Sequence, residues 1–228
     1  MLISFKYRFI FVANTKCAST SIEEYLQHSS DIAIRQQKKG KHWPADRIAR
    51  KYQHILMEQS LSISDFFRFG VVRDPVEWIV SWFNYRSRSE LSEHSEKSTH
   101  SISFNGFVNV LCSERETPAY AQFSTQARRF MSLDGKLSVS YLVPYPRISE
   151  DMDVIVRELR IPVKRSLKKI VRNVSPERMT VDEVSKSQRR RIEKAFERDK
   201  EIYELALNSD PGQLRLMLKD HRESIQYT

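Results

Sequence analysis

Two strongly apolar runs, each closed by a polar loop and a helical pattern, constrain the fold most. The first, Phe5–Ala13, is aromatic and β-branched and leads into Asn14, and the second, Phe66–Arg73, is stopped by Asp74 and Pro75. Such runs are typical of buried strands. Strands that alternate with helices form α/β domains with a mainly parallel sheet, in which ligands bind beyond the carboxyl ends of the strands. We therefore predict an α/β fold with a ligand site at the two loops.

The other elements follow from apolar spacing and from capping residues. Ser19 or Thr20 is expected to cap a helix that runs through Leu26, and Asp74 is expected to cap a helix that runs through Arg86. Further helices are expected near Ala45 and at about Phe104–Ser113, Ala121–Phe130 and Ser149–Leu159, and further strands at Asp31–Arg35 and Leu137–Tyr145.

The carboxyl-terminal part of the chain has a different pattern. From Val181 to Leu207 the sequence indicates one long charged amphipathic helix, followed by a short helix near Gln213–Lys219. A chain of 228 residues suits one domain. We predict a single α/β domain over residues 1–228, of which residues 181–228 form a helical carboxyl-terminal region.

Composition excludes several classes of protein. With 40% hydrophobic and 11% aromatic residues the chain can bury a sizeable core, which excludes global disorder. Lys6 and Arg8 interrupt the apolar amino terminus, and no apolar run reaches the ~20 residues of a membrane helix, so neither a transmembrane segment nor a signal peptide is expected. The two cysteines, Cys17 and Cys112, form no disulfide framework and no zinc site. A reducing, cytoplasmic compartment is predicted.

The charge favours anionic partners without selecting a function. The formal net charge is +9, from 38 Lys and Arg against 29 Asp and Glu. Such an excess suits nucleic acid, acidic lipid, polyanionic sugars or a phosphorylated small molecule. Part of it is clustered at Arg165–Arg172 and Arg189–Arg191, and solvated faces of surface helices are the simpler interpretation of both runs.

The first loop, Asn14–Ser21, has the composition of an anion cradle. Small residues between a strand and a helix leave amide N–H groups directed at a ligand, and the helix dipole favours negative charge there. Lys16 adds an ammonium group, and three consecutive hydroxyl residues, Ser19–Ser21, add donors. An ordinary Ser/Thr helix cap is the alternative; the combination with Lys16 and Ala18 favours the anion site. The loop lacks glycine and is not the GxxxxGK(S/T) loop of ATPases and GTPases.

This loop resembles the 5′-phosphosulfate loop of sulfotransferases that use 3′-phosphoadenosine-5′-phosphosulfate (PAPS). The similarity is to the Lys-x-Ala-Ser-Thr-Ser form of the uronyl 2-O-sulfotransferase branch, and suggests a bacterial relative of these carbohydrate enzymes. It implies a P-loop-like central sheet flanked by helices. It also implies donor contacts from the six residues Lys16, Cys17, Ala18, Ser19, Thr20 and Ser21.

The second loop strengthens the resemblance. Sulfotransferases carry an Arg at the end of a strand and a later helical Ser that bind the 3′-phosphate of PAPS, and these positions fall on Arg73 and Ser81. A planar guanidinium can hold phosphate through two hydrogen bonds, and Ser adds a short donor. An Arg–carboxylate pair at the strand end is the alternative for Arg73 alone. The chain departs from the pattern at Trp78, where many relatives have Arg, which leaves the adenine and acceptor contacts open.

Two further segments carry weaker similarity. Lys41-His42-Trp43-Pro44-Ala45 resembles the Lys-His-x-x-Ala segment of bacterial relatives, and implies that His42 is a general base whose pKa Lys41 lowers by charge repulsion. A structural or exposed His is the alternative. The segment of Arg172 and Asn173 resembles the late loop that closes over the nucleotide in sulfotransferases, and implies that both residues contact the donor. A simple capped turn is the alternative.

The resemblance implies transfer of a sulfuryl group from PAPS to a hydroxyl acceptor, compatible with a carbohydrate. Lys16 would stabilise charge on the bridging oxygen of the donor, His42 would take the acceptor proton, and no metal is required. Trp43, Trp78 and Trp82 lie near the site segments and could face a sugar ring or belong to the core. Two alternatives stay open: a basic nucleic-acid-binding protein, for which no recognition pattern is found, and a non-catalytic anion or nucleotide sensor.

Overall fold

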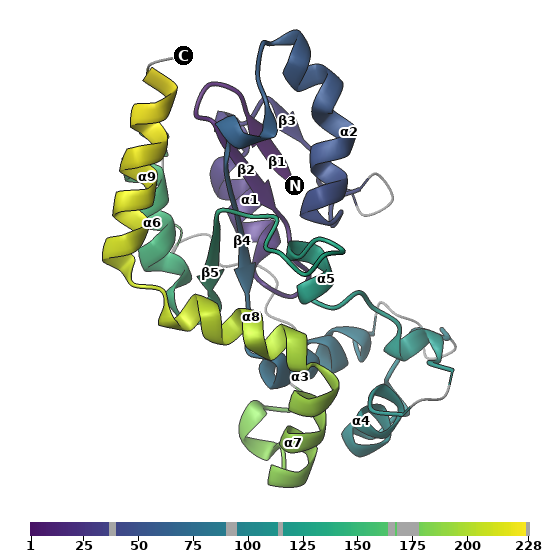
Figure 1. Ribbon diagram of the computed structural model, residues 1–228. Coiled ribbons are helices and arrows are strands. Elements are labelled where there is room, and N and C mark those ends of the chain that lie inside the picture. The colour runs from purple at the N-terminus through teal and green to yellow at the C-terminus, as the bar shows by residue number, and fades with distance from the viewer. Residues whose placement is uncertain (37–39, 90–94, 114–115, 164–166, 168–177, 227–228) are drawn as a thin grey trace.

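The computed structural model describes residues 1–36, 40–89, 95–113, 116–163, 167 and 178–226. In these ranges a five-stranded sheet forms the centre of the molecule (Figure 1). Its strands, in spatial order, are β3 (Ile32–Ala33), β1 (Leu2–Ser4), β2 (Phe9–Val12), β4 (Phe67–Val72) and β5 (Tyr141–Pro144). β2, β4 and β5 run parallel, so the carboxyl ends of β2 and β4, which carry the two polar loops, meet at one edge.

The amino-terminal strand differs from the prediction. Phe5–Ala13 was expected to be one strand, but β1 and β2 form an antiparallel hairpin, and β1 also pairs antiparallel with β3. The chain turns at Phe5–Arg8, where Arg8 adopts a left-handed backbone with φ of 49° and Asp31 accepts a hydrogen bond from the Phe5 amide at 2.6 Å. The sheet is therefore mixed rather than mainly parallel, although the strands that lead into the loops are parallel as predicted.

Helices cover both faces of the sheet, which confirms the α/β class (Figure 1). One face packs against α1 (Ser19–Leu26), α6 (Ile148–Glu158) and α9 (Pro211–Gln226), and the other against α2 (Ala45–Glu58), α5 (Ala127–Phe130) and α8 (Glu197–Asn208). Alternate side chains of β2 point to opposite faces of the sheet. Phe9 and Phe11 pack against the first group of helices, and Ile10 and Val12 pack against the second.

A helical lobe lies beyond the carboxyl ends of the parallel strands (Figure 1). It is formed by α3 (Pro75–Arg86), α4 (Phe104–Leu111) and α7 (Lys186–Ala195). Asp74 caps α3 as predicted, since its carboxylate accepts hydrogen bonds from the amides of Val76 and Glu77 at 2.9 and 3.0 Å. Aromatic rings, Trp78, Trp82 and Phe123 among them, fill the lobe and hold α3 in a fixed position above the sheet edge.

Several helix bounds differ from the predictions. α1 begins at Ser19 with Ala18 as a left-handed cap, so neither Ser19 nor Thr20 is the capping residue. The expected helix at Ala121–Phe130 is reduced to the four residues of α5. The long helix expected from Val181 to Leu207 is divided, because Phe196 leaves helical geometry and packs its ring against Trp78 and Phe123. α9 is longer than the short helix that was expected.

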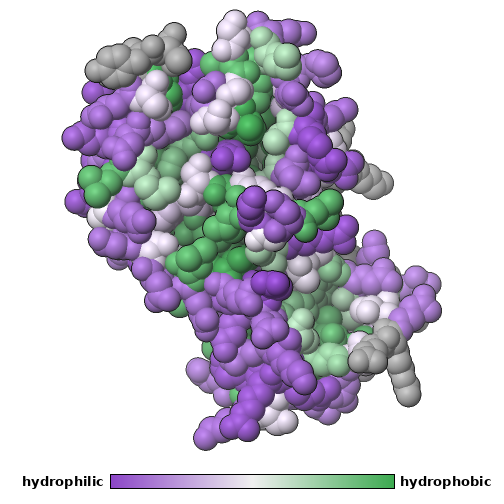
Figure 2. Space-filling view, viewed as in Figure 1, coloured by the Kyte–Doolittle hydropathy of each residue, from purple (hydrophilic) through white to green (hydrophobic). Residues whose placement is uncertain are grey.

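The surface in the view of Figure 1 is mostly hydrophilic. Figure 2 shows apolar side chains gathered over the middle of this face. Leu205 and Leu207 of α8 are among the exposed large hydrophobic side chains, as is Leu133 after α5. Among the described residues, no helix combines the length and the apolar character that crossing a membrane requires.

Candidate functional site

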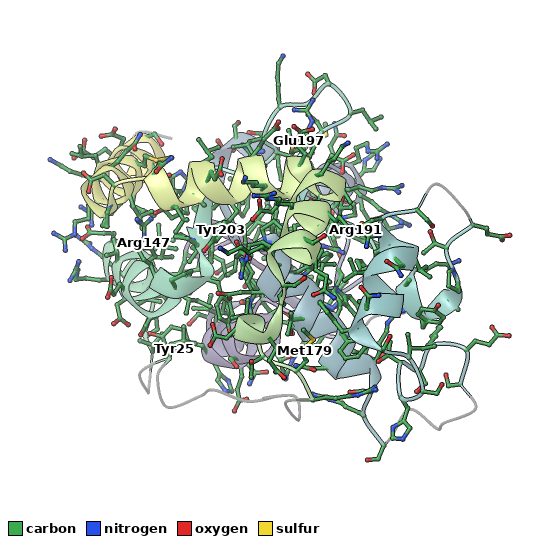
Figure 3. All side chains as sticks on the ribbon, turned by 90° about the horizontal axis from the view of Figure 1, so that it is seen from below. Tyr25, Arg147, Met179, Arg191, Glu197 and Tyr203 are labelled. Atoms are coloured by element: carbon green, nitrogen blue, oxygen red, sulfur yellow. The ribbon has the colours of Figure 1, made fainter. Side chains whose placement is uncertain are left out.

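A cavity of about 900 Å³ opens at the carboxyl edge of the sheet, where the two loops meet. Its wall includes the first loop and α1, the segment of Lys41 and His42, α3, Tyr145 and Ile148 just after β5, and the segment Met179–Asp182. Figure 3 looks at the molecule from this end and labels Met179, one of the residues that line the cavity. The cavity brings together eight of the predicted site residues: Lys16, Ala18, Ser19, Thr20, Ser21, His42, Arg73 and Ser81.

The first loop turns sharply so that the start of α1 faces the cavity. Lys16 and Ala18 both adopt left-handed backbones, with φ of 59° and 52°, and the first amides of a helix have no partner within the helix. Trp78 is fully buried and donates its indole N–H to the Thr15 carbonyl at 2.8 Å, which ties the loop to α3. Cys17 lies behind the loop in the core, and burial raises its thiol pKa to about 12.

Positive charge gathers around Lys16. Its ammonium lies 4.3 Å from the centre of the Tyr85 ring, and the Arg88 guanidinium lies 4.7 Å from the centre of the same ring. Burial, with the nearby charges of Arg88 and Arg73, lowers the pKa of Lys16 to about 8. Lys16 is thus mainly protonated at pH 7, and an anion in the cavity would stabilise its charged form.

The second loop places Arg73 and Ser81 on the same cavity. Arg73 follows β4, and its Nε donates to Glu77 at 3.0 Å while the guanidinium covers the Tyr145 ring at 4.4 Å. The Arg–carboxylate pair considered for Arg73 is therefore present. This pair uses the Nε–H of the guanidinium. The N–H groups of the two terminal nitrogens can donate hydrogen bonds to a phosphate.

His42 is held with one ring nitrogen against the backbone. Its Nδ1 lies 2.9 Å from the Ala13 carbonyl, so Nδ1 carries the proton in the neutral ring and Nε2 is the acceptor. Burial lowers the pKa of His42 to about 4, with Arg129 and Lys41 as smaller causes and the Ala13 hydrogen bond opposing them. The prediction that Lys41 lowers this pKa holds in direction, but burial is the main cause.

Comparison with known protein families decides the assignment. A family model described as "Sulfotransferase family" matches residues 1–206. The chain belongs to the sulfotransferase family. The matched range contains both loops and every strand of the described sheet. Membership of this family does not favour the nucleic-acid-binding alternative. No significant match was found among curated proteins or among solved structures.

Lys41 has a larger part in the site of this sulfotransferase than the sequence suggested. Its ammonium is nearly buried, lies 2.8 Å from a carboxylate oxygen of Glu23 and donates to the Thr20 hydroxyl at 3.3 Å. Glu23 is fully buried on α1. The pair joins the segment of His42 to the first loop, and the helical spacing of α1 gave no sign that Glu23 turns inward.

Gln126 is the second residue that sequence reasoning missed. It is fully buried just before α5, and its side chain forms hydrogen bonds with Asn14 and with the backbone of Arg73. Both partners lie far from Gln126 in the chain, and nothing in the local pattern signals the contacts.

The remaining predicted residues fall in different environments. Of the three tryptophans, Trp82 lines the cavity and stacks on Phe123, Trp78 belongs to the core, and Trp43 packs against the Arg47 guanidinium. Arg172 and Asn173 lie outside the described residues. In the part of the chain that is described, no three His, Cys, Asp or Glu side chains group as metal ligands, and the expectation that no metal is needed stays a prediction.

Proposed function

We propose that this sulfotransferase uses PAPS as its donor and transfers the sulfuryl group to a hydroxyl acceptor. One observation carries the proposal: the Lys16 loop and the Arg73–Ser81 pair, which are distant in sequence, line one cavity. PAPS carries two anionic groups, a 5′-phosphosulfate and a 3′-phosphate. A cavity with cationic side chains from two loops suits a ligand with two anionic groups.

The first loop would bind the 5′-phosphosulfate through Lys16, the hydroxyls of Ser19–Ser21 and the amides at the start of α1. Arg73 and Ser81 would bind the 3′-phosphate. Arg172 and Asn173 are proposed as further donor contacts from sequence similarity alone.

The reaction needs in-line positioning and charge stabilisation. The acceptor oxygen forms a bond to sulfur while the bond from sulfur to the bridging oxygen of the donor breaks. Lys16 would stabilise the negative charge that develops on that bridging oxygen, and Nε2 of His42 would take the proton of the acceptor hydroxyl. The products are a sulfate ester and adenosine-3′,5′-bisphosphate.

A carbohydrate acceptor is proposed, as in the uronyl 2-O-sulfotransferase branch that the first loop resembles. Trp82 and Tyr85 line the cavity, and aromatic rings suit the apolar faces of sugars. The net charge of +9 suits an anionic glycan. Assays with uronic-acid-containing and neutral oligosaccharides would identify the acceptor class.

Adenosine-3′,5′-bisphosphate is expected to stabilise the protein without magnesium. A ligand at ~100 times its Kd adds about 2.7 kcal/mol to the free energy of unfolding, which raises Tm by roughly 5–10 °C for a chain of this size. Differential scanning fluorimetry measures the shift, with Mg-ATP as the comparison ligand. A shift with Mg-ATP and none with the bisphosphate would contradict the proposed donor.

Arg73→Ala is expected to weaken binding of the bisphosphate by roughly 10- to 100-fold, since a charged hydrogen-bonded contact contributes about 1.5–3 kcal/mol. Adenosine-5′-phosphate lacks the 3′-phosphate, so its Kd should change far less. Isothermal titration calorimetry measures both. Arg128→Ala is the matched control, because Arg128 is an exposed arginine on α5; equal losses in the two variants would show that only net charge matters.

A further inference from the structure

Gln126 joins the two loops of the cavity through a single buried amide. Its Oε1 accepts hydrogen bonds from the Asn14 side-chain amide and from the Arg73 backbone N–H, both at 3.0 Å. Its Nε2 donates to the Arg73 carbonyl at 2.8 Å. One side chain thus holds the residue that begins the first loop and both backbone groups of the residue that begins the second.

The amide of Gln126 has one orientation that satisfies these partners. The N–H groups of Asn14 and Arg73 meet at Oε1, which the Cys17 thiol also approaches at 3.5 Å, and the carbonyl of Arg73 faces Nε2. A rotated amide would direct its own N–H groups at the two donors and its oxygen at the carbonyl. Because unpaired buried polar groups are costly, the rotated form is excluded and the contacts define a fixed geometry.

Asp199 fixes the backbone from which this side chain extends. Asp199 is a buried residue of α8, and its two carboxylate oxygens accept hydrogen bonds from the amides of Gln126 and Ala127 at 2.9 and 2.8 Å. Burial raises the pKa of Asp199 to about 6, so it is mainly ionised at pH 7. A carboxylate that binds two successive amides holds the origin of the Gln126 side chain in place.

The bonds of Gln126 lie where the sheet no longer connects the two strands. The pairing of β2 with β4 ends at Val12 and Gly70, and both loops begin beyond it. Past that point Asn14 donates to the Val71 carbonyl at 3.0 Å, and Gln126 spans from Asn14 to Arg73. The relative position of the loops therefore depends on side chains rather than on the ladder.

We propose that Gln126, held by Asp199, is a positioning residue that sets the separation between the Lys16 loop and Arg73. With that separation fixed, both anionic ends of the donor are bound at once. This inference rests on the proposed use of PAPS. Gln126 acts through the backbone of its partners and is not proposed to touch the donor.

The test compares two nucleotides in Gln126→Leu and in the wild type. The variant keeps every group that is proposed to contact the donor, but loses the bonds that fix the separation. We expect Kd for adenosine-3′,5′-bisphosphate to rise at least 10-fold and Kd for adenosine-5′-phosphate, which needs one loop, to change less than 3-fold. Asp199→Asn has one acceptor oxygen in place of two. It should also raise Kd for the bisphosphate more than Kd for adenosine-5′-phosphate, and it provides the test if Gln126→Leu does not fold.

Tyr141→Phe is the control for lost stability alone, because it removes a buried hydrogen bond to Asp151 of α6, and neither Tyr141 nor Asp151 is among the residues that line the cavity. It should lower Tm and leave both Kd values unchanged. Parallel changes of the two Kd values in Gln126→Leu and Asp199→Asn, or no change in either, would overturn the positioning role.

Amide hydrogen exchange without ligand separates this inference from the proposed function. The Arg73 amide, which donates to Gln126, and the amides of residues 14–18 should exchange at least 10-fold faster in Gln126→Leu than in Tyr141→Phe. If the wild type binds no bisphosphate, the proposed donor is wrong, and the exchange rates alone decide whether Gln126 positions the loops. Unchanged exchange at Arg73 would overturn the inference.

Discussion

Replacing Lys16 by alanine is expected to lower kcat by ~10²–10³-fold, the effect of removing one group that stabilises charge in a transition state. Affinity for adenosine-3′,5′-bisphosphate should fall by a smaller factor, because the bridging oxygen gains its charge only as the bond to sulfur breaks. Steady-state kinetics and calorimetry on the same preparation measure the two quantities. Turnover that survives in Lys16→Ala would show that the first loop has been assigned wrongly.

The pH dependence gives a second test of Lys16. Burial and the neighbouring arginines lower its pKa to about 8, and the protonated form is the one proposed to act. Activity should therefore fall as pH rises through about 8, and this basic limb of kcat/KM should be missing from the residual activity of Lys16→Ala. Lys51→Ala, which removes an exposed lysine of α2, is the control and should keep the limb.

The loops could be predicted because their signals are local. A continuous apolar strand followed by polar, helix-starting residues identifies both Asn14–Ser21 and the Arg73 loop, and the cap at Asp74 follows from the same kind of pattern. The hairpin of β1 and β2 was missed because its turn contains no Gly, Pro or Asn, and the left-handed residue is Arg8. A turn without these residues cannot be recognised from the sequence alone.

The parts of the site that were missed depend on contacts between distant residues. Gln126 bonds to Asn14 and to Arg73, which lie 112 and 53 positions away. Lys41 is paired with Glu23 on another element. The break between α7 and α8 is of the same kind, because Phe196 leaves the helix to join an aromatic cluster formed by α3 and Phe123. Local spacing carries no information on such pairings, and tertiary packing decides them.

His42→Ala is expected to lower kcat by ~10²–10⁴-fold, as loss of a general base does. The Ala13 carbonyl accepts from Nδ1 and so fixes Nε2 as the nitrogen with the free lone pair, and burial keeps the ring neutral at pH 7. Binding of adenosine-3′,5′-bisphosphate should stay nearly unchanged. His54→Ala, which removes an exposed histidine of α2, is the matched control and should retain full turnover.

The acidic side of the pH profile distinguishes a base from a structural histidine. Because the pKa of His42 is lowered to about 4, protonation of Nε2 should reduce kcat/KM as pH falls through about 4, well below the ordinary histidine range near 6.5. The bound donor brings negative charge into the cavity and stabilises the imidazolium, so the acidic limb of kcat should lie at higher pH than that of kcat/KM. Both His42 limbs should vanish in His42→Ala, whereas protonation of Asp199 near pH 6 affects the variant and the wild type alike. Circular dichroism at each pH verifies that the fold persists. Turnover within a few-fold of wild type would remove His42 from the mechanism, and a parallel loss of bisphosphate binding would make it a donor-binding residue instead.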